Sequence, residues 1–153
     1  MVAIGLGANL GDRRAHLQFA VDRLSAILRG VRVSTFIESE PVDVLEPQPA
    51  YLNGALVGET TLSPRELLDA LMALEREQGR VRTTYHAPRT LDLDLILYGD
   101  RLVHEPGLDV PHPRFRERAF VVDPLMEIAP DLVDPVTGKT VAQLSHSLRP
   151  EHA

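Results

Sequence analysis

Cysteine, lysine and long apolar runs are missing or scarce in this sequence of 153 residues. The absence of cysteine excludes a disulfide bond and a thiolate metal site. No apolar run approaches the length of a membrane span, and the first residues lack the basic and apolar regions of a signal peptide. We therefore expect a soluble cytoplasmic protein.

Positive charge is also scarce, and arginine carries nearly all of it. Of the 16 basic residues only Lys139 is a lysine, and the net charge is -6. This balance argues against general binding to nucleic acid or to an anionic membrane. Seven arginines nevertheless lie between Arg80 and Arg118, which favours a specific polyanionic ligand. The alternative is a set of solvated surface arginines.

Hydrophobic periodicity predicts a repeated order of elements in one domain covering residues 1–153. The pattern through Tyr98 reads strand, helix, strand, strand, helix, strand. The strands are expected at 2–6, 31–38, 51–62 and 91–95, and the helices at 13–28 and 63–79. Ser63, Pro64 and Glu66 form the capping box that begins the second helix.

This order is typical of an α+β protein with the ferredoxin-like split βαβ sandwich. We expect an antiparallel-containing sheet with both long helices on one face, and the other face free for ligands. The first and fourth strands should form the central pair, so the glycine-rich turn at 5–11 should neighbour the last strand. The residues after Tyr98 should form a small C-terminal extension.

Two aspartates stand out in the last of these strands. Alternation puts Asp92 and Asp94 on one face, about 6.6 Å apart at roughly 3.3 Å per residue. Such a carboxylate pair can share hard cations. Arg89 adds a planar fork for a phosphate or a carboxylate. The alternative is an ordinary amphipathic strand with a wet acidic face. In the preceding strand, Tyr51 and Asn53 share one face.

The segment 87–96, Ala-Pro-Arg-Thr-Leu-Asp-Leu-Asp-Leu-Ile, resembles the signature of the hydroxymethyl-dihydropterin pyrophosphokinases of folate biosynthesis. The resemblance covers nearly the whole chain. It includes the segments 5–11, 51–53, 74–75, 78–82, 110–112 and 118–120.

This resemblance implies transfer of pyrophosphate from ATP to the hydroxymethyl group of a reduced pterin, with AMP as the second product. It implies that Asp92 and Asp94 bind two magnesium ions and that Asp92 helps to orient the substrate hydroxyl. We also expect a monomer that acts on two small molecules, ATP and the pterin, with no nucleic-acid or membrane partner.

By the same resemblance, the arginine-rich segments contact ATP. Arg82, Arg89 and His112 resemble triphosphate contacts, with the two arginines in the catalytic set. Further candidates for the nucleotide site are Glu75, Arg80 and Arg118. Other roles are open for most of this set: surface ion pairs for Arg80 and Arg118, packing for His112, and an ion pair with local arginines for Glu75.

The pterin site is implied in the same way. Asn53 resembles the amide that reads the pterin edge, and Tyr51 and Phe120 resemble its aromatic walls. Ser39, Pro41 and Val42 lie where the family supplies loop and backbone contacts. Plain core packing is the alternative for Phe120, and a turn position is the alternative for Asn53.

The chain departs from the family pattern at several positions. Glu40 stands before Pro41 where a second proline is frequent, Tyr85-His86 replaces a large group, and Pro113 follows His112 where an aromatic residue is common. Two rival functions use the same fold: another metal-dependent nucleotidyl enzyme, and a non-catalytic ligand-binding module. The rival module has no need for a carboxylate pair beside an arginine cluster.

Overall fold

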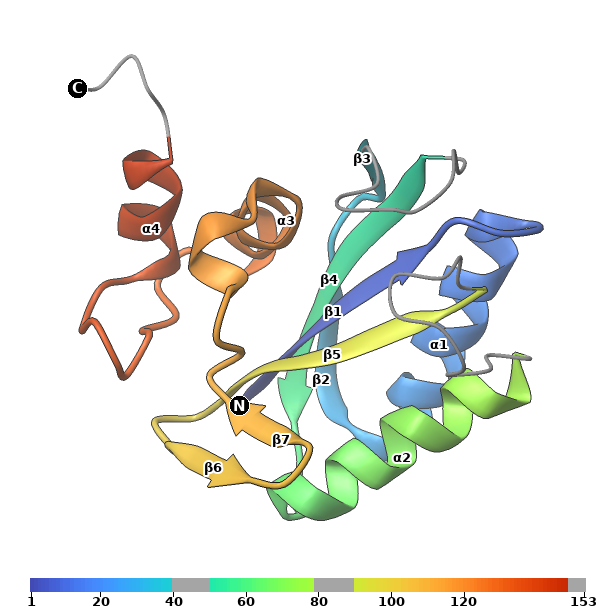
Figure 1. Cartoon of the computed structure of the whole chain (residues 1–153), viewed down its shortest axis with the longest axis horizontal. Helices are drawn as coiled ribbons and strands as arrows, with labels where there is room; N and C mark the ends of the chain where they lie inside the picture. Colours follow the sequence, from blue (N-terminus) through green and yellow to red (C-terminus); the bar gives the residue numbers. More distant parts are fainter. Residues whose placement is uncertain (40–49, 79–89, 149–153) are drawn as a thin grey trace.

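The computed structural model describes residues 1–39, 50–78 and 90–148. Its elements follow the predicted order and continue into a C-terminal extension (Figure 1). The strands are β1 (Val2–Ala8), β2 (Arg29–Val33), β3 (Ile37–Ser39), β4 (Tyr51–Glu59), β5 (Asp92–Tyr98), β6 (Val103–Glu105) and β7 (Leu108–Val110). The helices are α1 (Arg13–Ile27), α2 (Pro64–Glu77), the 3-10 helix η1 (Phe115–Glu117), α3 (Ala119–Ile128) and α4 (Val141–Ser147). The protein is therefore an α+β protein.

The main sheet has the order β2-β4-β1-β5, with β3 as a second partner of β4, and every pairing is antiparallel. The predicted central pair is wrong, because β1 lies between β4 and β5. Among the described residues, β5 has β1 as its only strand neighbour. The glycine-rich segment still neighbours the strand of the two aspartates, as predicted, since Gly7 pairs with Asp92 and Gly5 pairs with Asp94.

The single strand expected at 31–38 is two strands, β2 and β3. Val33 pairs with Leu56 and Ile37 pairs with Asn53. The chain therefore advances by four residues from β2 to β3 while the partner strand β4 advances by three. The extra residue breaks the ladder, as a bulge does. Gly54 provides the room for this break, because a Cβ atom there would lie 2.7 Å from Cδ1 of Phe36.

Both long helices begin at the caps that their sequences predict. Asp12 accepts a hydrogen bond from the N–H of Ala15 (3.1 Å) at the start of α1. The predicted capping box of α2 is confirmed, because Ser63 Oγ accepts the N–H of Glu66 and Glu66 accepts the N–H of Ser63. These caps fix the residue at which each helix begins, and so help to determine which side chains of α1 and α2 face the sheet.

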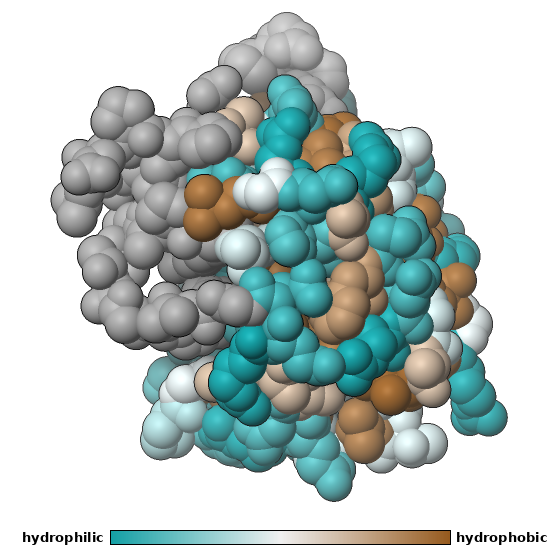
Figure 2. Space-filling view, turned by 90° about the vertical axis from the view of Figure 1, so that its right-hand side faces the viewer, coloured by the Kyte–Doolittle hydropathy of each residue, from teal (hydrophilic) through white to brown (hydrophobic). Residues whose placement is uncertain are grey.

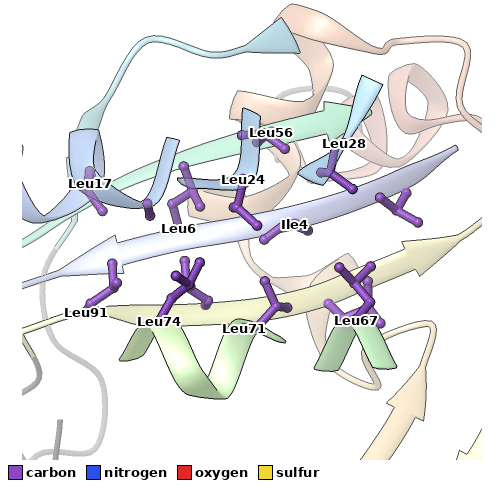
Figure 3. Packing of buried hydrophobic residues seen from close by; sticks show 14 of the residues in the cluster. Ile4, Leu6, Leu17, Leu24, Leu28, Leu56, Leu67, Leu71, Leu74 and Leu91 are labelled. Atoms are coloured by element: carbon purple, nitrogen blue, oxygen red, sulfur yellow. The ribbon is translucent and has the colours of Figure 1, made fainter. Parts of the chain in front are cut away.

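The first layer of the core lies between these helices and the sheet. Leucines of α1 and α2 meet side chains of β1, β4 and β5 (Figure 3). The buried members labelled there are Ile4, Leu6, Leu17, Leu24, Leu28, Leu56, Leu67, Leu71, Leu74 and Leu91. This layer confirms that both long helices cover the same face.

The opposite face of the sheet is covered in part. Ala3, Ala55 and Val57 alternate with residues of the first layer and pack in a second cluster with side chains of η1, α3 and α4. The expectation of a wholly free second face is therefore wrong at this end of the sheet. No helix of the described residues is long and apolar enough to cross a membrane.

Candidate active site

The uncovered part of the second face carries polar side chains from two strands that flank β1. Leu91, Leu93 and Leu95 pack in the first core layer, so Asp92 and Asp94 point to the opposite face. Both aspartates are half-buried. The predicted amphipathic strand and its two-carboxylate face are thus present.

Two glycines of β1 form the floor between these side chains. Gly7 pairs with Asp92 on one side and with Asn53 on the other, so the carboxylate and the amide flank a residue that has no side chain. A Cβ atom at Gly7 would lie 3.3 Å from Oδ1 of Asn53 and 3.6 Å from Cδ1 of Tyr51. Strand spacing places Asn53 and Asp92 roughly 10 Å apart across β1.

Asn53 is held in one orientation. Its side chain is 5% exposed, and its Nδ2 donates to Oγ of Ser39 at 2.6 Å. With this donor in use, Oδ1 is the atom that would meet a Cβ atom at Gly7. The bond brings together two residues that were predicted to share a site.

Arg13 secures the strand that carries Ser39. Its Nη1 donates to the carbonyl of Ala50 (2.7 Å), and its Nη2 pairs with Oε1 of Glu38 (2.8 Å). One guanidinium therefore ties β3 to the residue before β4. The sequence contained a signal for this role that we did not use. A positive side chain in the first turn of a helix interacts unfavourably with the helix dipole, so an arginine there suggests a compensating contact with nearby acceptors.

His112 stands beside the aspartate strand. Its backbone N–H donates to the carbonyl of Ile96 (3.0 Å), and its ring Nδ1 accepts the backbone N–H of Arg114 (3.2 Å). Burial lowers the pKa of His112, the positive charge of Arg118 lowers it further, and the charge of Asp92 opposes the shift. The imidazole of His112 therefore lies close enough to Arg118 and Asp92, two other predicted site residues, to be affected by both charges.

Phe120 and Arg118 lie at the start of α3. The guanidinium of Arg118 stands over the ring of Phe120, 5.7 Å from its centroid. Phe120 is partly buried and packs against the second core cluster. Its ring therefore combines the predicted packing role with an exposed part that can face a ligand.

Glu75 differs from the other members of the set because it is buried. Its side chain is 1% exposed, and its Oε2 accepts the N–H of Leu93 at 2.8 Å. It thus touches the strand between the two aspartates. The predicted contacts Pro41, Val42, Arg80, Arg82 and Arg89 lie outside the described residues.

The glycine pair is the part of the site that our reading of the sequence missed. We expected the strand to end at Leu6 and a glycine-rich turn to follow, whereas β1 continues through Gly7 to Ala8. Two glycines at period two in an apolar strand share one face, and this spacing could have predicted a strip of the sheet without side chains of its own. Figure 2 views the end of the molecule where β1 finishes and α1 begins, and the described surface there is mainly hydrophilic.

Fold and candidate site together define an α+β protein with a group of polar side chains on the uncovered part of one sheet face. The model of the family 7,8-dihydro-6-hydroxymethylpterin-pyrophosphokinase (HPPK) matches residues 3–130. The chain therefore belongs to this family.

Individual relatives agree with the family match. The chain is 46% identical over 144 residues to a 2-amino-4-hydroxy-6-hydroxymethyldihydropteridine pyrophosphokinase of Synechocystis sp., covering 92% of this chain and 72% of the relative. It is 45% identical to the enzyme of the same name from Pseudomonas aeruginosa, covering 86% and 82%.

A solved structure shares the fold. The crystal structure of Plasmodium falciparum HPPK-DHPS matches with a TM-score of 0.73 at 12% identity, covering 95% of this chain. The chain spans 44% of the length of that protein.

Proposed function

We propose that this protein is an ATP-dependent pyrophosphokinase of folate biosynthesis. It transfers pyrophosphate from ATP to the hydroxymethyl group of 6-hydroxymethyl-7,8-dihydropterin and yields AMP and the pterin diphosphate. Family membership supports the reaction. The observation that carries it in the structure is the double pairing of Gly7, a position without a side chain that has Asp92 on one side and Asn53 on the other.

The reaction joins the hydroxyl oxygen of the pterin to the β-phosphorus of ATP. The bond between that phosphorus and the oxygen bridging the α- and β-phosphates breaks, so AMP leaves and the β,γ unit moves intact. The proton of the hydroxyl is released to the solvent in this step. Negative charge spreads over the phosphoryl oxygens, so catalysis depends on positioning and on nearby positive charge.

Asp92 and Asp94 would hold two Mg²⁺ ions, which when bound neutralise charge on the triphosphate. The donor set fits this ion, because Mg²⁺ takes few protein carboxylates and keeps water and phosphate oxygens as its other ligands. Within the described ranges there is no group of three or more His, Cys, Asp or Glu side chains that could hold a metal by itself. Asp92 would also orient the attacking hydroxyl.

His112 and Arg118 would bind the triphosphate, together with the predicted Arg80, Arg82 and Arg89. The pKa of His112 supports this grouping, because the charge of Arg118 lowers it and the charge of Asp92 raises it. A guanidinium binds phosphate with paired donors, and an imidazole adds one more. Glu75 would act at the same end of the site, where it accepts a backbone N–H of the strand that carries the aspartates.

The pterin would lie over Gly7 with its pyrimidine edge at Asn53 and its hydroxymethyl arm toward Asp92. Asn53 supplies the amide, oriented by Ser39. Tyr51 and Phe120 would form aromatic walls. Pro41 and Val42 would add contacts from the segment before Ala50. The distance across β1, roughly 10 Å, matches a bicyclic ring with a one-carbon arm.

The assay that tests the function supplies ATP, Mg²⁺ and the reduced hydroxymethylpterin. We expect AMP and the pterin diphosphate in equal amounts. Formation of ADP, or of pyrophosphate with a cyclic nucleotide, would instead identify another metal-dependent nucleotidyl enzyme. Binding of both ligands with ATP left intact would identify the non-catalytic module.

Gly7→Ala is expected to weaken pterin binding selectively. The new Cβ atom would force Oδ1 of Asn53, 3.3 Å away, to shift by a few tenths of an ångström. We expect the KM for the pterin to rise about tenfold, which corresponds to ~1.4 kcal/mol, while the KM for ATP changes little. Gly5→Ala is the matched control, since its Cβ atom would meet Ile96 at an ordinary 3.5 Å. Equal effects of the two variants would contradict the placement of the pterin.

Binding of MgATP is expected to be coupled to proton uptake by His112. In the free protein the pKa of His112 is lowered from its ordinary value of 6.5. A bound triphosphate favours the imidazolium and raises that pKa, so affinity should increase as pH falls from the pKa of the complex to that of the free protein. Calorimetry at pH 6.5 in buffers of different ionisation enthalpy measures the uptake. His112→Gln should remove it and weaken binding about tenfold, whereas the exposed control His146→Gln should keep it. Unchanged uptake in His112→Gln would assign the proton elsewhere.

We also propose that the whole chain, residues 1–153, forms one pyrophosphokinase domain with the ferredoxin-like split βαβ arrangement. The strand order β2-β4-β1-β5 and its antiparallel pairings support this description. The monomeric state and the cytoplasmic location stay predictions from the sequence.

A further inference from the structure

Glu75 is a buried carboxylate that bonds to the backbone of the aspartate strand. It lies in the last turns of α2, its side chain is 1% exposed, and its Oε2 accepts the N–H of Leu93 at 2.8 Å. Leu93 stands between Asp92 and Asp94 in β5. One side chain of a core helix therefore contacts the backbone at the centre of the candidate metal site.

The edge position of β5 explains why this contact matters. Successive N–H groups of a strand point to opposite edges, and the N–H of Leu93 goes to Glu75 although Leu93 is aligned with Leu6 of β1. The N–H of Leu93 thus points away from β1, to the side where the described structure has no further strand. The carboxylate of Glu75 occupies the place of a strand partner.

A second bond ties the same part of β5 to the same helix. The hydroxyl of Thr90 donates to the carbonyl of Gln78, the C-cap of α2, at 2.6 Å. The two bonds anchor the strand at Thr90, before the aspartates, and at Leu93, between them. They fix the direction of this short segment relative to a helix that is itself packed by Leu71 and Leu74.

We infer that Glu75 is a positioning residue that sets the geometry of Asp92 and Asp94 for divalent cations by holding the N–H of Leu93. This inference rests on the proposed function. Glu75 affects the nucleotide site indirectly: its side chain extends from α2 to the backbone of β5, and β5 carries the two aspartates. Groups that orient metal ligands from behind typically change metal affinity by about 10- to 100-fold when they are replaced.

Reach and charge can be separated at this position. Glu75→Gln keeps an oxygen acceptor at the same reach and removes the charge. Glu75→Asp keeps the charge, but its side chain is one methylene shorter and withdraws the acceptor from Leu93. A role in positioning depends on reach, whereas an ion pair or a long-range attraction for cations depends on charge.

The experiment measures Mn²⁺ binding by electron paramagnetic resonance with a non-hydrolysable ATP analogue, together with AMP formation. We expect Glu75→Gln to bind Mn²⁺ within about twofold of the wild type and Glu75→Asp to bind it about tenfold more weakly. Leu67→Ala is the control for stability, because it removes a buried side chain from the beginning of the same helix, far from the bond to Leu93. It should unfold at a lower temperature with unchanged Mn²⁺ affinity.

Three results would overturn the inference: unchanged Mn²⁺ affinity in both variants, a loss confined to Glu75→Gln, or a loss of equal size in both. Failure of the proposed function is a different result, because the wild type itself would then form no AMP. The wild-type measurement thus separates the two.

Discussion

Asp94→Ala is expected to lower kcat/KM for pyrophosphate transfer by about 10³-fold, equivalent to ~4 kcal/mol of transition-state stabilisation. The substitution leaves one carboxylate on the open face of β5 to hold the cations that the triphosphate needs. The fold should persist, since Asp94 is half-buried and the leucines on either side of it stay in the core. Steady-state AMP formation and thermal unfolding measure the two effects.

Two further variants sharpen this result. Asp94→Asn preserves the shape and removes the charge, so it should fail nearly as completely as Asp94→Ala. Asp69→Asn changes an exposed carboxylate of α2 and should leave the rate unchanged. Activity that survives in both Asp94 variants would remove this residue from the metal site.

The local features of this fold could be predicted because each depends on residues close together in the sequence. Alternation in β5 placed Asp92 and Asp94 on one face, and the capping box of Ser63 and Glu66 began α2. The strand order could not be read in the same way. Whether β1 pairs with β4 as well as β5 depends on contacts between distant segments, and our choice of central pair was wrong.

The same limit applies to the candidate site. The residue types of the site, acidic, amide and aromatic, were visible in the sequence, and the family resemblance supplied their roles. The floor at Gly7 and the link from Arg13 to Glu38 and Ala50 were not visible, because they arise only when three strands and a helix start come together. The buried position of Glu75 was hidden for the same reason, since periodicity gives the face of a helix but not its contact with a strand edge.

Asp134→Ala is expected to be the most destabilising replacement of a polar residue in the described part of the chain. Asp134 is 0% exposed and links the turn before α4 to η1. Its Oδ1 accepts Nη2 of Arg116 (2.9 Å) and the N–H of Val136 (3.0 Å), while its Oδ2 accepts Nε of Arg116 and the hydroxyl of Thr137. Loss of a buried charge partner with several bonds costs about 3 kcal/mol.

Urea unfolding followed by circular dichroism measures this loss at pH 7. A change of ~3 kcal/mol corresponds to a fall in Tm of roughly 6–12 °C for a chain of this size. The exposed ion pair of Arg65 and Glu105 provides the matched control. Glu105→Ala should cost less than about 1 kcal/mol. Similar losses in the two variants would mean that the Asp134 network adds little beyond a surface pair.

The pH dependence of the same difference separates the charge of Asp134 from its packing. Burial raises the pKa of Asp134, but hydrogen bonds from Arg116, Thr137 and Val136 outweigh it and bring the pKa below its ordinary value of 3.8. A carboxyl with a lowered folded-state pKa stabilises the protein fully above its unfolded pKa and loses that contribution as pH falls through the folded pKa. The stability gap between wild type and Asp134→Ala should therefore stay constant from pH 7 to 5 and narrow below about pH 3.8. A gap that stays the same in acid would assign the effect to packing, because a neutral side chain would then stabilise the turn as well as the carboxylate does.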